Sequence, residues 1–333
     1  MSDDAVAHTD ARTGSTLRAL RGLFHTRESS LFLVILVAFA ALWILKGSIF
    51  FSVKNFEGIV TGIVYDLLMA GGMTVVLVLW GIDLSVGAVL ALVSVVTAML
   101  LQAKVGIPLS VGCGLLCALA VGAMNGLCVA YLRIAPFIVT LAAMSVARGV
   151  ALVLSSGYFV SGLPRAYSSI SEGKIGGLPA PYLLVAILLV LLHLLLTRWK
   201  FLNQAFYVGT NPRAAVLSGI NASWVTFVGY VISAFMAGVA AIFMSSKLAM
   251  GFSQFGQLAE LRAIAAAVIG GASFTGGSGS ILGATLGVVL IAIINNGFVL
   301  LHGSPNWQQA VSGIILLIAV AVDALRTRRE RRE

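Results

Sequence analysis

Long apolar runs, each followed by a short polar break, repeat along the chain from about residue 30. A helix that spans a membrane needs about 20 apolar residues, and continuous rather than alternating apolar runs indicate helices rather than strands. We therefore predict an all-α, polytopic membrane protein with about ten spanning helices. Their approximate ranges are 30–50, 57–80, 84–103, 107–133, 136–156, 181–197, 222–246, 259–272, 277–301 and 306–325.

The two ends of the chain are polar. Residues 1–29 mix acidic and basic side chains, and residues 326–333 are rich in arginine. A cleaved signal peptide would have a shorter charged segment and an apolar core of about 7 to 15 residues, so an uncleaved first span is the better interpretation. The expected organisation is an N-terminal tail (1–29), a membrane domain (30–325) and a basic C-terminal tail (326–333).

The composition supports a membrane location. Hydrophobic residues make up 59% of the chain, charged residues only 10%, and the mean hydropathy is +1.04. Ordinary soluble domains carry about 25% charged residues. The net charge of +9 does not indicate nucleic-acid binding, because the basic residues lie at span ends and in the tails rather than on an aromatic-rich soluble face.

The basic residues also predict the topology. With ten spans and the N-terminus in the cytoplasm, 13 of the 21 Lys and Arg residues fall on the cytoplasmic side. Two lie at membrane depth, Arg148 and Arg262, and six fall outside: Lys46, Lys54, Lys104, Arg165, Lys174 and Lys247. This imbalance follows the positive-inside rule and places both termini in the cytoplasm.

One long polar and basic break, RWKFLNQAFYVGTNPRAAVLSGIN at residues 198–221, falls on that cytoplasmic side. We call it the coupling segment. Asn211 and Pro212 are a helix-start signal, and residues 213–220 are expected to form a short helix that ends at Gly219. The segment is either a solvated connector or a docking surface. A docking surface would present Asn211, Pro212, Arg213, Ala214, Ala215 and Gly219.

Two glycine-rich blocks interrupt the apolar pattern in the same way. The first is GGMTVVLVLWGIDLSVGA (71–88) and the second is AIAAAVIGGASFTGGSGSILGA (263–284). In each, an apolar segment ends in glycine, and a helix restarts from capping residues, Asp83 and Ser85 in the first block and Ser278 and Ser280 in the second. Such matched breaks indicate a transport path built on broken helices. Alternatively, the glycines only permit close helix packing. Those of interest are Gly81, Gly87, Gly270, Gly271, Gly276 and Gly277.

Several polar side chains lie inside the predicted spans. Asp66, Arg148, Glu260 and Arg262 are costly there and require partners or water. Neutral polar groups could line a path for a sugar or polyol, or could instead join helices to one another. The path candidates are Asp83, Ser85, Asn125, Thr140, Asn295, Asn296 and Gln308.

Signs of catalysis or metal binding are lacking in the sequence. Cys113, Cys117 and Cys128 share one apolar span without metal-ligand partners. His193 lies in a uniformly apolar run and is interpreted as a packing residue. There is no catalytic triad and no P-loop motif, so we expect no enzyme, no metal and no cofactor bound by this chain.

Five stretches, in order, resemble one family: GGMTVVLVLWGIDLSVGAVLAL, AMNGLCVAYLRIAPFIVTLAAMSVARG, FYVGTNPRAAVLSGIN, LRAIAAAVIGGASFTGGSGSILGATLGVVL and NNGFVLLHGSPNWQQAVSGIILLIAV. They are similar to the permease subunits of ribose-, xylose- and arabinose-type ABC importers, across about residues 57–322. The chain departs from that pattern at Leu202 and Asn203, where the family usually has Gly-Arg, and at Arg262, where an acidic residue is common.

The resemblance implies a type II ABC-importer-like permease fold in the bacterial inner membrane. It implies three partners: a second permease subunit, a periplasmic sugar-binding protein, and a cytoplasmic ATPase that uses ATP and Mg²⁺ and receives the coupling segment. Relatives that carry autoinducer-2 or deoxysugars share this scaffold, so a pentose is only the default substrate. The alternative is an ion- or proton-coupled transporter that works alone, through Asp66 with Arg148 or Glu260 with Arg262.

Overall fold

The computed structural model describes residues 27–303 together with 307, 310, 311, 313, 314, 316–318, 320, 321 and 323. Most of the expected N-terminal tail, the whole expected C-terminal tail and Gln308 lie outside the described residues. The helices are α2 (Arg27–Phe50), α3 (Val53–Val78), α4 (Val86–Gln102), α5 (Ile107–Ala130), α6 (Pro136–Ser155), α7 (Arg165–Glu172), α8 (Ala180–Arg198), α9 (Lys200–Thr210), α10 (Pro212–Leu217), α11 (Ala222–Leu248), α12 (Ala259–Ile269) and α13 (Ile281–Leu300). Two short antiparallel strands, β1 (Lys174–Ile175) and β2 (Leu178–Pro179), form a hairpin.

Within the described part of the chain, seven helices are long and apolar enough to cross a membrane: α2, α3, α5, α6, α8, α11 and α13. The apolar helix α4 is shorter, with 17 residues. The all-α, polytopic class is therefore confirmed. The number of about ten spans stays a prediction.

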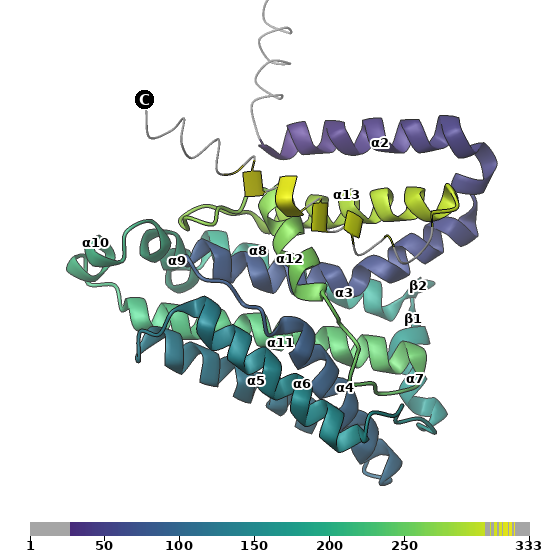
Figure 1. Cartoon of the computed structure of the whole chain (residues 1–333), viewed down its shortest axis with the longest axis horizontal. Coiled ribbons are helices and arrows are strands. Elements are labelled where there is room, and N and C mark those ends of the chain that lie inside the picture. The colour runs from purple at the N-terminus through teal and green to yellow at the C-terminus, as the bar shows by residue number, and fades with distance from the viewer. Residues whose placement is uncertain are drawn as a thin grey trace, which may run out of the picture.

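Helices α3 and α11 occupy the centre of the molecule. In Figure 1, α2 and α13 lie along one edge, and α4, α5 and α6 lie toward the opposite edge. The most apolar window of α11 is 61% buried and that of α3 is 56% buried, against 22% for α5. The outer helices expose large apolar side chains such as Leu116 and Val146. A lipid-facing surface has this character, because lipid tails are as apolar as leucine.

The connections gather at two ends of the spanning helices. Helices α9 and α10 lie at one end, where α2 also begins, and α7 with the β1–β2 hairpin lies at the other (Figure 1). The coupling segment (198–221) and residues 157–180, which lie between two predicted spans, are thus at opposite ends of the molecule (Figure 1).

Two stretches between the predicted spans are irregular and pack against other helices. Residues 79–85 are irregular before α4 begins, and residues 251–258 precede the 11-residue α12 without forming a helix. Residues 251–256 run beside the first half of α4, where the Phe252 amide donates to Ser94 Oγ at 3.4 Å. A Cβ on Gly256 would lie only 2.7 Å from the Gly87 carbonyl oxygen. Irregular backbone at membrane depth is tolerated where protein or water covers it, and here the irregular segment 251–258 and the start of α4 cover one another.

Candidate functional site

A buried carboxylate organises the first glycine block. Asp83 Oδ1 accepts hydrogen bonds from the amide of Ser85 at 3.0 Å and from its hydroxyl at 2.6 Å, and Oδ2 accepts from Ser233 Oγ at 2.8 Å. Asn125 Nδ2 donates to Ser85 Oγ at 2.9 Å. These four side chains, the Asp83 cluster, are 0% exposed. They join the irregular turn to α5 and α11.

The same turn is held from two more sides. Thr140 of α6 and Tyr230 of α11 both donate hydroxyl hydrogen bonds to the Ile82 carbonyl, at 3.3 and 3.4 Å. A Cβ on Gly81 would lie 2.5 Å from the Tyr230 hydroxyl, so the glycine permits this close approach. The expected side-chain cap by Ser85 is not formed; its oxygen accepts from Asn125 Nδ2 instead of from a backbone amide of α4.

The structure thus brings four of the path candidates together, Asp83, Ser85, Asn125 and Thr140, and leaves none of them exposed. Their polar groups bond largely to one another and to the backbone of the turn. Ser233 belongs to this group but was not among the candidates, since a lone serine within an apolar span carries no distinguishing pattern.

The asparagines of α13 lie elsewhere. Asn296 and Asn55 exchange side-chain amide hydrogen bonds of 2.7 and 3.2 Å, which tie α13 to the beginning of α3. Asn295 Oδ1 is buried and has no hydrogen-bond partner among the described residues. The structure does not bring this pair into the Asp83 cluster.

The coupling segment folds into two helices. One face of α9 is buried through Leu202, Ala205 and Val208, a spacing of three residues that suits a short surface helix. Asn211 Oδ1 accepts from the Ala214 amide at 3.1 Å and caps α10, which begins at Pro212. Gly219, with φ 82°, follows the end of α10. The predicted short helix is therefore present within the predicted range.

The exposed side of α10 differs from the expected one. Arg213 and Ala214 are exposed, but Ala215 is only 4% exposed and packs into the core. The expectation that Ala215 is presented to a partner is therefore wrong. Val216 and Leu217 are instead 57% and 89% exposed, so α10 presents two apolar side chains at this end of the molecule.

The coupling segment touches both glycine blocks at one point, which we call the junction. The Gly277 amide donates to the Val78 carbonyl at 2.9 Å. A Cβ on Gly209 of α9 would overlap the Val78 carbonyl, and one on Gly276 would lie 2.7 Å from the Gly209 carbonyl. Gly276 and Gly277 have φ values of 76° and 72°, which favour glycine. The end of α3, the end of α9 and the turn before α13 thus meet backbone to backbone.

Three of the remaining selected glycines also lie at tight turns or contacts. A Cβ on Gly270 would overlap the backbone of Gly283 in α13, and one on Gly87 would lie 2.5 Å from Glu260 Oε2. Gly271 has φ 99°, a conformation that favours glycine. The sequence left close packing and a broken-helix path as alternatives. The contacts of these glycines agree with close packing, and the path stays a prediction.

Asp66 pairs with Arg262 and not with Arg148, the partner considered for an ion-coupled transporter. Glu260, in contrast, interacts electrostatically with Arg262 and with Arg148. Arg262 Nη2 lies 3.3 Å from Asp66 Oδ1. Arg148 Nη1 donates to the carbonyls of Ser253 at 2.8 Å and Phe255 at 2.7 Å, and these hydrogen bonds hold the irregular segment before α12 against α6. Glu260 is 7% exposed. In the part of the chain that the structure describes, no three His, Cys, Asp or Glu side chains form a metal site.

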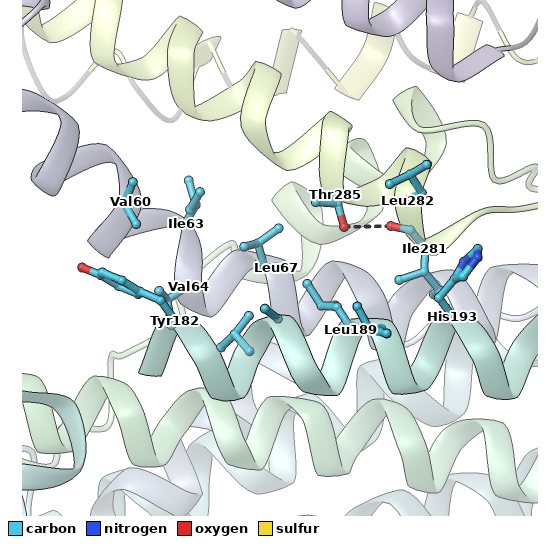
Figure 2. A pocket seen from close by; sticks show the side chains of 13 residues that line it. Val60, Ile63, Val64, Leu67, Tyr182, Leu189, His193, Ile281, Leu282 and Thr285 are labelled. Carbon is cyan, nitrogen blue, oxygen red and sulfur yellow. Dashed lines mark hydrogen bonds between the residues drawn. The ribbon is translucent and has the colours of Figure 1, made fainter. Parts of the chain in front are cut away.

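A cavity of about 390 Å³ lies between α3, α8 and α13 (Figure 2). Its volume is within the range of small-molecule sites, but its walls are almost wholly apolar, and Leu67 and Leu189 are typical. Thr285 contributes a hydroxyl, which already donates to the Ile281 carbonyl at 2.8 Å. The other polar residues at its wall are Tyr182 and His193. The cavity suits hydrocarbon better than a sugar, which needs many hydrogen-bonding groups.

Irregular segments between apolar helices, with a short helical segment packed against them, are typical of membrane transport proteins. The chain matches the family described as branched-chain amino acid transport system / permease component over residues 55–320, and it belongs to this family.

Its relatives include import permeases. The chain is 36% identical to the ribose import permease protein RbsC of Bacillus subtilis, over 82% of this chain and 86% of the relative. It is 30% identical to the galactose/methyl galactoside import permease protein MglC of Escherichia coli, over 95% and 100%. It is 32% identical to the autoinducer 2 import system permease protein LsrC of Yersinia enterocolitica, over 90% and 83%. No solved structure matches the chain.

The family resemblance predicted from the five stretches is confirmed. The chain is a permease subunit of the ABC import class and a multi-pass protein of the bacterial inner membrane, and the comparisons favour this interpretation over a transporter that works alone.

Proposed function

We propose that this chain forms the membrane pathway of an ATP-driven importer that moves a monosaccharide into the cytoplasm. A periplasmic binding protein would deliver the sugar, a second permease subunit would complete the pathway, and a separate cytoplasmic ATPase would supply the energy with ATP and Mg²⁺. This chain would bind no cofactor. The relatives' import functions and the polar groups at membrane depth support the proposal.

The substrate class is a neutral, hydroxyl-rich small molecule. The relatives named for ribose, galactose and autoinducer-2 include a pentose and a hexose importer, so they do not fix the size of the sugar that this chain would carry. A pentose, a hexose, a deoxysugar or a related polyol all fit this class.

The proposed topology has ten crossings with both termini in the cytoplasm. Besides the seven long helices, the irregular turn with α4 and the irregular segment with α12 each provide one crossing. The tenth is residues 307–323, whose described members are helical. An even number of crossings agrees with the excess of basic residues at the end that holds α9 and α10.

The junction is the observation that carries the proposal. Movement of an ATPase bound at α10 would pass along α9 to Gly209, and from there to Val78 and Gly277, which touch it directly. These two residues border the broken crossings. The Asp83 cluster would keep the first irregular turn intact during the movement, because all its polar groups are buried and most are hydrogen bonded.

Purification and reconstitution test the proposal. The chain is co-expressed with its candidate ATPase and binding protein, and labelled sugars are offered to proteoliposomes with and without internal ATP. We expect uptake that requires the ATPase, ATP and the binding protein. Uptake by the chain alone, driven by a proton or sodium gradient, would refute it in favour of a secondary transporter.

A further inference from the structure

One sector of α3 is polar and open where the helix lies at membrane depth. Its outer half exposes Gly58 and Gly62, and Tyr65 and Asp66 are partly exposed one turn further along. Helices α5 and α6 expose mostly leucine, valine and phenylalanine, and α6 also exposes Ser145 and Gly149, but neither helix exposes a carboxylate. A spanning helix that faces only lipid has no reason to present a carboxylate.

The depth of the sector follows from the helix itself. Asp66 is the fourteenth residue of the 26-residue α3, about 20 Å from its first residue. Its ion pair with Arg262 of α12 leaves the Asp66 side chain 24% exposed and the Arg262 side chain 30% exposed. Charged side chains near the bilayer centre face protein or a water-filled cavity. Both members of the pair are partly exposed in the single chain, so water or a second protein must cover them.

Two further observations point to an open space. A Cβ on Gly58 or Gly62 would meet nothing within 4 Å, so neither glycine serves helix packing within the chain. The irregular segment before α12 also exposes Gln254 and Gln257. Arg262 Nη1 reaches the Gln257 carbonyl at 3.5 Å, which brings this segment to the edge of the same sector.

The sector is open toward one end only. The beginning of α3 is tied to α8 through Thr61 Oγ1 and the Tyr182 hydroxyl, 2.9 Å apart, at the end that carries α7 and the hairpin (Figure 1). From Leu68 to the end of α3 every residue is buried. The open sector therefore stops near mid-depth, short of the junction.

We propose that Gly58, Gly62, Tyr65, Asp66, Gln257 and Arg262, the outer polar strip, line a water-filled vestibule and contact the sugar in it. The Tyr65 ring offers a flat face, the Asp66 carboxylate accepts hydrogen bonds from hydroxyl groups, and Arg262 and Gln257 donate to them. The occupant is a neutral polyhydroxylated solute. The sugar contact rests on the proposed function, but the presence of water does not.

Cysteine labelling tests the strip in the reconstituted complex. The three native cysteines are first replaced by alanine. Gly62→Cys is then compared with Leu116→Cys on the apolar outer surface of α5, where the Leu116 side chain is 64% exposed. The probe is a charged, membrane-impermeant thiol reagent added from outside. Because only the thiolate reacts, and an apolar environment raises the thiol pKa, we expect Gly62→Cys to react at least about tenfold faster than Leu116→Cys.

Uptake of labelled monosaccharide is then measured before and after modification. We expect the bulky label at Gly62→Cys to stop uptake, and Tyr65→Leu to reduce uptake at least about tenfold while Tyr65→Phe, which keeps the ring, stays near the parent. Equal labelling at the two cysteines would overturn the vestibule and indicate that lipid or a second copy covers the strip. Rapid labelling with undiminished uptake would overturn the sugar contact. If the unmodified complex takes up no sugar, the proposed function fails. The relative labelling rates still show whether water reaches the outer polar strip.

Discussion

The substitution Gly209→Ala tests the junction most directly. Gly209 lies in the last turn of α9 and has no positive φ, so alanine suits its backbone and would, by helix propensity alone, stabilise the helix by about 1 kcal/mol. The added Cβ, however, would overlap the Val78 carbonyl and lie 2.7 Å from the Gly277 amide nitrogen, two groups that are hydrogen bonded to each other.

The magnitude follows from these opposing terms. Overpacking of this kind costs about 1 to 3 kcal/mol, and loss of the Gly277–Val78 hydrogen bond costs about 1 kcal/mol more. Set against the gain in propensity, the net loss of stability is about 1 to 3 kcal/mol. Most of the polar and apolar contacts of α9 are untouched, so the variant should still insert and assemble.

The assay measures two quantities on the purified complex, the thermal midpoint in detergent and the number of sugar molecules moved per ATP hydrolysed. We expect Gly209→Ala to lower both. Gly149→Ala is the matched control, because Gly149 also lies in a helix and a Cβ there would meet nothing within 4 Å. If Gly209→Ala has the same midpoint and the same coupling ratio as Gly149→Ala, the junction does not transmit the movement of the ATPase.

Three further predictions follow from the described contacts. Ser233→Ala removes one donor from the buried Asp83 carboxylate and should cost about 1 to 3 kcal/mol; an unchanged thermal midpoint would show that the cluster does not stabilise the turn. Leu217→Glu should insert normally but fail to co-purify with the ATPase, whereas Ala215→Glu should lower the amount of folded protein, because a charge would be buried; co-purification of Leu217→Glu at the parent level would exclude α10 as the docking surface. Reporter fusions within α7 and α10 should report opposite sides of the membrane, and a common side would invalidate the ten-crossing topology.

The spanning helices could be predicted from sequence because the signal is local and repeated. About 20 consecutive apolar residues define α5 or α8 with little ambiguity, and the predicted starts at 107 and 181 agree with helices that begin at Ile107 and Ala180. The same reasoning left residues 251–258 between two predicted spans, but it could not show that they pack beside α4. Their backbone is held by contacts with α4, about 160 positions earlier in the chain, and hydropathy carries no record of such contacts.

Part of the candidate site could likewise be predicted from the sequence, and part depends on the tertiary fold. The glycines of the two blocks could be selected from their spacing, but their contact with Gly209 depends on the tertiary fold. The charged residues were recognisable, yet the pairing of Asp66 with Arg262, 196 positions apart, could not be chosen over the other combinations. Ala215 was assigned to the wrong side, because a six-residue helix is too short for its periodicity to show which face is buried.

The division of α3 into an open outer half and a buried inner half has an electrical consequence. If water reaches Asp66, the external aqueous solution extends to the middle of the membrane. The residues from Leu68 to Val78 then form the insulating layer, which is about 16 Å thick at 1.5 Å per residue. The transmembrane voltage then falls across about half the usual distance, and its field there is about twice as strong. Moving one elementary charge through that layer still involves about 2.3 kcal/mol per 100 mV. A neutral sugar experiences no force from this field, whereas an ion that enters the layer does, so the voltage acts on leaking ions and not on the transported sugar.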